Sequence, residues 1–245
     1  MQISRRGLLS VAPALTGAAV AVGCGERASV SGRNRTADDE WERVRAEFSI
    51  SPETIDLSAL LIASHPRPVR EAIKEYRRRL DNNPTIYLQD DNDRLQQRTL
   101  EHAADYLGVA TEELALTDST TAGLGLLYNG FQLQPGEEFL TTEHDYYATK
   151  EALRLAALRC GATVRTIRLY RDIHSVSADE LVENLKSAIK PATRVAAVTW
   201  VHSSTGLKLP IRRMADALRE INRERDRSER VQLCVDGVHG FGLRM

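Results

Sequence analysis

From Thr111 to the end of the printed chain, short apolar runs rich in β-branched residues alternate with segments of helical periodicity. The predicted strands are 113–117, 138–142, 162–169, 195–201 and 232–235, and the predicted helices between them are 121–131, 148–160, 178–189 and 210–224. Such alternation predicts an α/β fold with a mostly parallel sheet covered by helices. A chain of 245 residues is long enough to bury one sizeable core of this kind.

Ahead of this region, the pattern is helical rather than alternating. Helices are predicted over 39–48, 68–80 and 91–107, and Gly108 is expected to end the last of them. The expected organisation is a signal segment over 1–24, a linker with one helix over 25–50, a helical segment over 51–110, and part of a large cofactor-binding domain over 111–245.

The first 24 residues are predicted to be an export signal. Ser4-Arg5-Arg6-Gly7-Leu8-Leu9 matches the twin-arginine pattern, and an apolar run of small residues follows it. That run is shorter than the roughly 20 residues that a membrane-spanning helix needs. We therefore expect export by the twin-arginine route to a periplasmic or membrane-anchored extracytoplasmic location, with either cleavage after Ala21 or a lipid anchor at Cys24.

Charge and cysteine content exclude two broad classes. The formal net charge is -1 and no long basic block occurs, which argues against a nucleic-acid partner. The three cysteines, Cys24, Cys160 and Cys234, are too few and too scattered for a disulfide framework or a zinc knuckle. Cys160 and Cys234 fall in helix and strand patterns, where small core residues are expected.

Three stretches place polar residues where predicted strands end. In the first, an apolar run stops at Asp236-Gly237, and His239 follows among glycines. A carboxylate delivered into a glycine-rich loop is typical of a site at the carboxyl end of a parallel strand. Asp-Gly is also a common turn former, so a simple turn is the alternative.

The second stretch, Thr117 to Gly125, carries hydroxyl side chains at a strand-to-helix junction. Free amide groups and the helix dipole at such a junction can hold an anion such as phosphate. The glycine spacing fits neither a dinucleotide-binding fingerprint nor a Walker loop. A helix with a Ser or Thr cap and closely packed glycines is the alternative interpretation.

The third stretch runs from Trp200 to Ile211, and a related one covers 143–147. In the former, His202 and the following hydroxyls are expected at the same sheet edge as Thr120 and Asp236. The latter, Glu-His-Asp-Tyr-Tyr, offers aromatic rings that could stack on a flat ligand.

Together these stretches resemble the class V aminotransferase family of pyridoxal phosphate enzymes, within its isopenicillin N epimerase and cysteine desulfurase branch. The motifs that carry the resemblance occur in the family's order: Ser-Thr-Thr at a helix start, P-G-E-E-F-L-T-T-E-H-D-Y-Y, S-S-T-G-x-x-L-P-I and V-D-G-V-H-G. The resemblance covers the chain from about Asn83 onward. It implies the large domain of the fold type I pyridoxal-phosphate-dependent transferases.

The resemblance also implies a role for each candidate residue toward pyridoxal 5'-phosphate. Asp236 would pair with the protonated pyridine nitrogen. Thr120 and Thr121 would bind the phosphate. Tyr146 would stack on the ring, with His144 or Tyr147 as alternatives. Ser203 and His239 would approach the phenolic oxygen.

One feature of the family is not found among the printed residues. Its members form a Schiff base through a lysine after the Asp-Gly motif, and none of Lys74, Lys150, Lys186, Lys190 and Lys208 stands in that context. No catalytic residue is therefore assigned. The chain is expected to be an amino-terminal fragment without the carboxyl-terminal small domain, and exposed apolar surface with an unpaired sheet edge is expected to follow.

A complete protein of this kind is expected to be a homodimer acting on an amino acid by transaminase or epimerase chemistry. Cysteine desulfuration is less favoured, because neither Cys160 nor Cys234 lies in a mobile loop pattern. The main alternative is a non-catalytic remnant or weak cofactor-binding protein. A serine hydrolase lacks its G-x-S-x-G elbow, and a metal hydrolase built on His144, His202, Asp236 and His239 would have unfamiliar ligand spacings.

Overall fold

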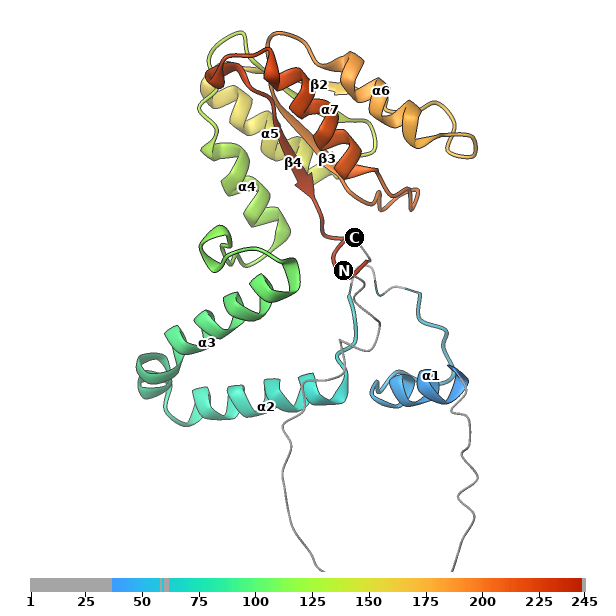
Figure 1. Ribbon diagram of the computed structural model, residues 1–245. Coiled ribbons are helices and arrows are strands. Elements are labelled where there is room, and N and C mark those ends of the chain that lie inside the picture. Colours follow the sequence, from blue (N-terminus) through green and yellow to red (C-terminus); the bar gives the residue numbers. More distant parts are fainter. Residues whose placement is uncertain (1–36, 58, 60–61, 244–245) are drawn as a thin grey trace, which may run out of the picture.

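The computed structural model describes residues 37–57, 59 and 62–243 (Figure 1). The predicted signal segment and the proposed anchor at Cys24 lie outside these residues. Among the helices that are described, none has both the length and the apolar character needed to cross a membrane.

A four-stranded parallel sheet forms the centre of the large domain. It consists of β1 (Glu138–Thr142), β2 (Thr163–Ile167), β3 (Thr193–Thr199) and β4 (Gln232–Asp236), in the order β2-β1-β3-β4. All three strand pairs are parallel, so the four carboxyl ends meet at one edge. The predicted α/β fold with a mostly parallel sheet is confirmed.

Helices cover both faces of this sheet (Figure 1). One apolar core contains residues of α4 (Thr120–Gly130) and α5 (Tyr147–Cys160), and a second contains residues of α6 (Ala178–Ala188) and α7 (Ile211–Arg223). Side chains along β3 alternate between these two cores. The same alternation decides on which face each side chain at the carboxyl edge lies.

The amino-terminal helices are α1 (Ala37–Ala46), α2 (Arg67–Asn82) and α3 (Pro84–Leu107). The last begins seven residues before the predicted start at Asp91, because the Asn83 side chain accepts a hydrogen bond from the amide of Ile86 at 3.2 Å. A proline in the first turn suits such a start. The helix ends at Gly108, whose positive φ of 70° is that of a left-handed cap, as predicted.

The predicted strand over 113–117 is wrong. The structure has a short 3-10 helix there, η2 (Thr111–Glu113), followed by irregular chain to Ser119. A strand exists only through pairing with a neighbour, and this segment joins no strand of the β2-β1-β3-β4 sheet. Side chains satisfy its backbone instead: Glu113 accepts from the amide of Ala110 at 2.9 Å, and Thr117 donates to the carbonyl of Ser119 at 3.1 Å.

The predicted strand over 195–201 is also shorter than expected at its carboxyl end. It stops at Thr199, and Val201 instead forms an antiparallel bridge with Lys208. This bridge closes a turn in which Gly206 has a φ of 71°, a conformation that favours glycine. A polar loop is thereby held directly beyond the central strands.

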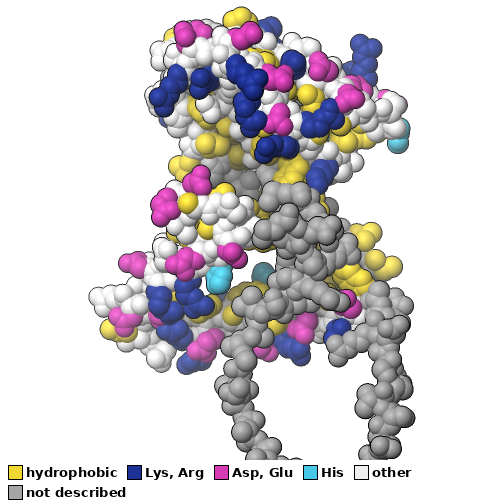
Figure 2. Space-filling model, in the orientation of Figure 1, with side chains coloured by type: hydrophobic (Ala, Val, Ile, Leu, Met, Phe, Trp, Pro, Cys, Tyr) yellow, Lys and Arg dark blue, Asp and Glu magenta, His cyan; other side chains and the backbone are white. Residues whose placement is uncertain are grey.

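A buried carboxylate ties three strands together at the opposite, amino edge. Glu138 of β1 accepts two hydrogen bonds from Arg165 of β2, at 2.7 and 2.8 Å, and one from Thr193 of β3 at 2.7 Å. Burial opposes ionisation of Glu138, but these partners outweigh it and lower its pKa. Elsewhere, basic and acidic side chains intermingle over the face formed by α6 and α7 (Figure 2).

Candidate functional site

Asp236 is the last residue of β4 and its side chain is buried. One carboxylate oxygen accepts a hydrogen bond from the amide of Val238 at 3.1 Å, and the backbone carbonyl accepts from Trp200 at 2.8 Å. Within the described parts of the chain, no lysine, arginine or histidine forms an ion pair with it. Because an unpaired buried carboxylate is costly, this position suits a ligand that brings a cation or a strong hydrogen-bond donor.

Strand alternation places Asp236 on the α4 and α5 side of the sheet. Cys234, two residues earlier on β4, belongs to the α4 and α5 core. Thr199 follows Ala197 of that core by the same interval and pairs with Asp236 in the β3–β4 register. The carboxyl edge of this face therefore carries a polar group above an apolar core.

Thr120 and Thr121 are the first two residues of α4, and both are exposed. The side chain of Ser119 caps this helix by accepting from the amide of Ala122 at 3.1 Å. The amino end of α4 extends beyond the sheet edge at which β4 ends (Figure 1). Unpaired first-turn amides and the helix dipole are therefore available to an anion on the same side of the sheet as Asp236.

Close packing explains the glycine at position 123, which the sequence alone did not. A Cβ at this position would lie 3.1 Å from the Thr117 hydroxyl, so glycine lets the chain before α4 approach the helix closely. Both sequence interpretations of this stretch are thus compatible, since a capped, closely packed helix still presents free amides at its start.

The loop 143–147 carries three aromatic rings in two different settings. Tyr146 and Tyr147 are exposed, with ring centroids 4.5 Å apart. His144 instead stacks on Tyr170, with centroids 4.7 Å apart and planes at 23°. Tyr146 and Tyr147 contact each other but are exposed, so they are accessible to a ligand, whereas His144 is half-buried against Tyr170.

His202 and Ser203 point to different environments. His202 is buried, with its ring centroid 5.4 Å from that of His144 and 6.3 Å from that of Tyr170. Neither of its ring nitrogens has a hydrogen-bond partner among the residues that the structure describes. Ser203 lies exposed in the turn beyond β3. The expected convergence of this stretch on the sheet edge thus brings His202 into a buried cluster and leaves Ser203 at the surface.

Burial lowers the pKa of His202, and the neighbouring His144 adds to this, while Asp145 acts in the opposite direction. In the unfolded chain, His202 should bind a proton near the ordinary histidine pKa of about 6.5. In the folded protein, it should bind that proton only at a lower pH. We expect the free energy of unfolding to fall as the pH drops below about 6.5, by up to about 1.4 kcal/mol per pH unit. Urea unfolding between pH 7.5 and pH 5.5 measures this pH dependence of the free energy of unfolding. His202→Phe should make the dependence weaker, whereas His174→Asn, at an exposed histidine, should leave it unchanged.

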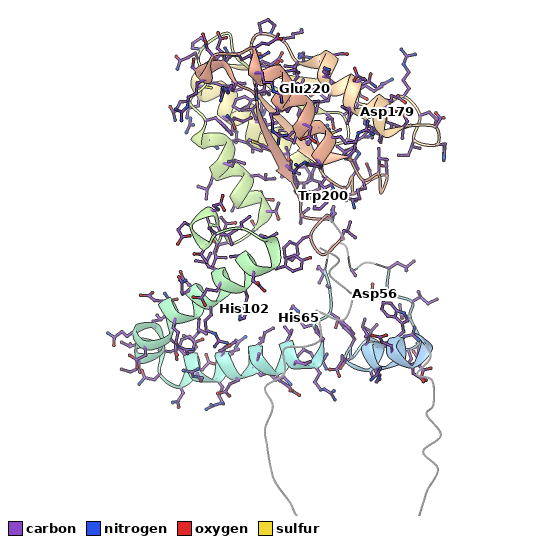
Figure 3. The ribbon with its side chains drawn as sticks, in the orientation of Figure 1. Asp56, His65, His102, Asp179, Trp200 and Glu220 are labelled. Carbon is purple, nitrogen blue, oxygen red and sulfur yellow. The ribbon has the colours of Figure 1, made fainter. Side chains whose placement is uncertain are left out.

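The loop after β4 places His239 half-buried and packs Gly240 against Trp200. The indole lies at the carboxyl end of the sheet beside this loop (Figure 3), and Lys208 sits over it at 5.6 Å from the ring centroid. A second lysine near the site, Lys150, donates to the carbonyl of Glu143 at 2.8 Å. Both lysines near the site loops are therefore engaged with neighbouring groups.

Gly240→Ala should disturb this loop, because the new Cβ would overlap the indole of Trp200. We expect a loss of about 1–3 kcal/mol in the free energy of unfolding, typical of overpacking, together with a shift in Trp200 emission. Gly125→Ala is the matched control, since a Cβ there meets nothing within 4 Å and helix propensity favours alanine. An equal loss in both variants would argue against the tight contact.

Residues 62–242 match the family model for class V aminotransferases. The chain belongs to the class V aminotransferase family. Isopenicillin N epimerase from Amycolatopsis lactamdurans is 31% identical over 206 residues, covering 83% of this chain and 49% of that protein. A probable cysteine desulfurase from Mycoplasma pneumoniae is 24% identical over 180 residues, covering 71% of this chain and 43% of that protein.

Solved structures agree on the fold. The cysteine desulfurase CsdA from Escherichia coli superposes with a TM-score of 0.63 at 19% identity, covering 80% of this chain and 48% of that one. A C-DES mutant with glycine covalently linked to its PLP cofactor gives 0.60 at 22% identity, covering 72% and 45%. The large-domain fold of the fold type I transferases is thus confirmed. The chain spans about half the length of the relatives it matches.

The two cysteines that the structure describes, Cys160 and Cys234, are not disposed for nucleophilic chemistry. Burial raises the pKa of the Cys234 thiol to about 11, and Cys160 donates its S–H to the carbonyl of Ala156 at 3.1 Å. No cluster of three or more metal-binding side chains occurs in the part of the chain that is described. A pocket of about 360 Å³ between α7 and β4 lies away from the carboxyl-edge site.

Sequence reasoning missed two residues at the carboxyl edge. Asp145 is buried and accepts hydrogen bonds from Thr141, Thr142 and Thr199, although in the sequence it looks like an ordinary loop carboxylate. Tyr128 is fully buried, and its hydroxyl has no hydrogen-bond partner in the described part of the chain. Burial, followed by the charges of Cys234, Asp145 and Asp236, raises its pKa. Its position in an apolar helix pattern gave the only signal, and that signal predicts core rather than site.

Proposed function

We propose that this chain forms the cofactor-binding large domain of a pyridoxal-phosphate-dependent enzyme that acts on an amino acid by transaminase or epimerase chemistry. The buried, cation-free carboxylate of Asp236 carries the proposal. It lies on the same face of the sheet as the amino ends of α4 and α5. Family membership supports the same cofactor, because class V aminotransferases use pyridoxal phosphate.

The residues present fit four parts of the cofactor. Asp236 would hold the protonated pyridine nitrogen, and Thr120 and Thr121 would hold the phosphate at the start of α4. Tyr146, exposed beside its neighbouring tyrosine, would cover the ring. Ser203 and His239 would approach the phenolic oxygen. When bound, the cofactor supplies an electron sink for a carbanion at the amino-acid α-carbon.

This chain spans about half the length of its relatives. Catalysis on an amino acid and a homodimer are therefore proposed for a protein of the relatives' full length. The epimerase relatives, up to 31% identical, favour racemisation-type or transfer chemistry over desulfuration. The buried, high-pKa Cys234 favours the same choice. A weak cofactor-binding protein without catalysis is the second candidate, favoured by the hydrogen bond that engages Lys150.

Binding of pyridoxal 5'-phosphate to the Trp41→Phe variant tests the proposal, with quenching of Trp200 fluorescence as the signal. Affinity for pyridoxal 5'-phosphate should exceed that for pyridoxal at least tenfold, because only the phosphorylated form uses the α4 amino end. Gel filtration should remove the bound compound, which indicates reversible binding. Equal affinity for the two compounds would contradict the phosphate site, and absence of quenching by either would contradict the cofactor site.

Export by the twin-arginine route is proposed separately, from the Ser4–Leu9 pattern and the apolar run of small residues that follows it. Replacing both with lysine should hold the protein in the cytoplasm, measured by fractionation of cells that produce the wild type and the variant. Cys24→Ser should release the protein from the membrane fraction without blocking export if Cys24 carries a lipid. Export of the Arg5→Lys, Arg6→Lys variant at the wild-type level would contradict the route.

A further inference from the structure

Asp145 joins the carboxyl ends of two strands through one buried side chain. Its Oδ2 accepts from the Thr142 amide at 2.6 Å and from the Thr141 hydroxyl at 2.7 Å, both on β1. Its Oδ1 accepts from the Thr199 amide of β3 at 2.6 Å. The amide of Asp145 itself lies 3.3 Å from the carbonyl of Thr142, which folds the loop back on the strand.

The bonds of Asp145 continue directly to the residues proposed to hold the cofactor. On one side, Asp145 precedes Tyr146, which begins the α5 region and has no side-chain bond that caps the helix. On the other side, Thr199 pairs in register with Asp236, and the next amide, that of Trp200, donates to the Asp236 carbonyl at 2.8 Å. One carboxylate therefore connects the loop that bears the ring with the strand pair that bears the acid.

We propose that Asp145 is a positioning residue that fixes the ring of Tyr146 at its distance from the carboxylate of Asp236. This rests on the proposed function, since those two groups bound the space in which the pyridine ring would lie. Charged acceptors make short, directional hydrogen bonds, and locked neighbours hold a binding group within a fraction of an ångström. Asp145 itself does not touch the cofactor in this account.

Asp145→Asn is the informative variant because it keeps the shape and removes one acceptor. The two backbone amides approach different carboxylate oxygens, so the NH₂ of asparagine must face one of them. That amide loses its buried partner and the loop loses its tie to one strand. Asp172→Asn is the matched control, because Asp172 also accepts from a backbone amide, that of His174 at 3.0 Å, but in an exposed loop.

The experiment measures pyridoxal 5'-phosphate affinity, by quenching of Trp200, in a double-mutant cycle on the Trp41→Phe chain. Asp145→Asn should lower affinity about tenfold, and Asp172→Asn should leave it within about twofold. In a Tyr146→Ala background, Asp145→Asn should have little further effect, because the ring it positions is gone. Amide hydrogen exchange over 140–147 and 196–201 should rise in Asp145→Asn and not in Asp172→Asn.

Three outcomes would overturn the proposal. Wild-type affinity in Asp145→Asn, with faster exchange at Thr142 and Thr199, would show that the tie exists but does not position the site. A tenfold loss that is the same with and without the Tyr146 ring would show a general effect on the fold. Failure of the Trp41→Phe parent to bind pyridoxal 5'-phosphate would contradict the proposed function and this inference with it, which separates that case from the other two.

Discussion

Replacing Asp236 with alanine should lower the affinity for pyridoxal 5'-phosphate by about 10- to 100-fold. A charge-assisted hydrogen bond contributes about 1.5–3 kcal/mol, and Asp236 is the carboxylate that would make it with the protonated ring nitrogen. The loss should be much smaller for an analogue of pyridoxal 5'-phosphate in which CH replaces the ring nitrogen. Equilibrium dialysis against the cofactor measures the change.

Two further variants separate charge from shape at this position. Asp236→Asn keeps an oxygen that can accept a hydrogen bond from the Val238 amide, which lies 3.1 Å from the wild-type carboxylate. The variant loses the charge, so most of the affinity loss expected for Asp236→Ala should remain. Asp179→Asn, at the start of α6 (Figure 3), is the control for an exposed carboxylate on the other face of the sheet, and it should bind as the wild type does. Full affinity in Asp236→Asn would remove the ionic role from the account.

Phe139→Ala should cost about 3–5 kcal/mol of the free energy of unfolding. The ring is fully buried on β1, which pairs with both β2 and β3, and it contacts Phe131 edge to face at a centroid distance of 6.4 Å. Its removal leaves a cavity between the sheet and the α4 and α5 core. Many domains are stable by only 5–15 kcal/mol, so the variant should unfold at a much lower urea concentration.

The control for this loss is a phenylalanine at the surface. Phe241 is exposed and meets only the ring of Tyr106, at 5.0 Å, among the ring contacts described, so Phe241→Ala should cost less than about 1 kcal/mol. Chemical denaturation of the two variants side by side gives the comparison. A Phe139→Ala variant as stable as Phe241→Ala would contradict the assignment of the α4 and α5 core.

The alternation of strands and helices was readable because buried parallel strands are continuous apolar runs and the covering helices have an apolar stripe. β1 was predicted with its observed bounds, Glu138–Thr142. The strand predicted over 113–117 failed because local β-propensity says nothing about whether a partner strand is present. The start of α3 was missed because the apolar periodicity begins several residues after the cap at Asn83.

The candidate site was readable in part for a related reason. Asp236 stands out in the sequence because a polar residue ends an apolar run, and the structure places it buried at the strand end. Asp145 does not stand out, because its importance lies in bonds to Thr142 and Thr199, and the latter is 54 residues away. Contacts of that kind arise from strand order, which a local pattern does not encode. The burial of His202 against Tyr170 was hidden for the same reason.

Several large apolar side chains of the described region are exposed. Leu126 and Leu158, on α4 and α5, are each 69% exposed, and among the described strands β4 pairs only with β3. Surfaces of this kind favour association with further protein. We expect the purified chain to self-associate in a concentration-dependent way, and Leu126→Gln with Leu158→Gln to reduce it, as measured by light scattering. A monodisperse monomer at high concentration would contradict this.

The protonation state of the bound ring nitrogen tests the central claim most directly. Nitrogen-15 NMR of pyridoxal 5'-phosphate labelled at that atom reports it, at a pH where the free ring is deprotonated. We expect a protonated nitrogen on the wild-type chain and an unprotonated one on Asp236→Ala. A bound nitrogen that is unprotonated on the wild type would show that Asp236 does not face the ring, and the proposed cofactor site would be wrong.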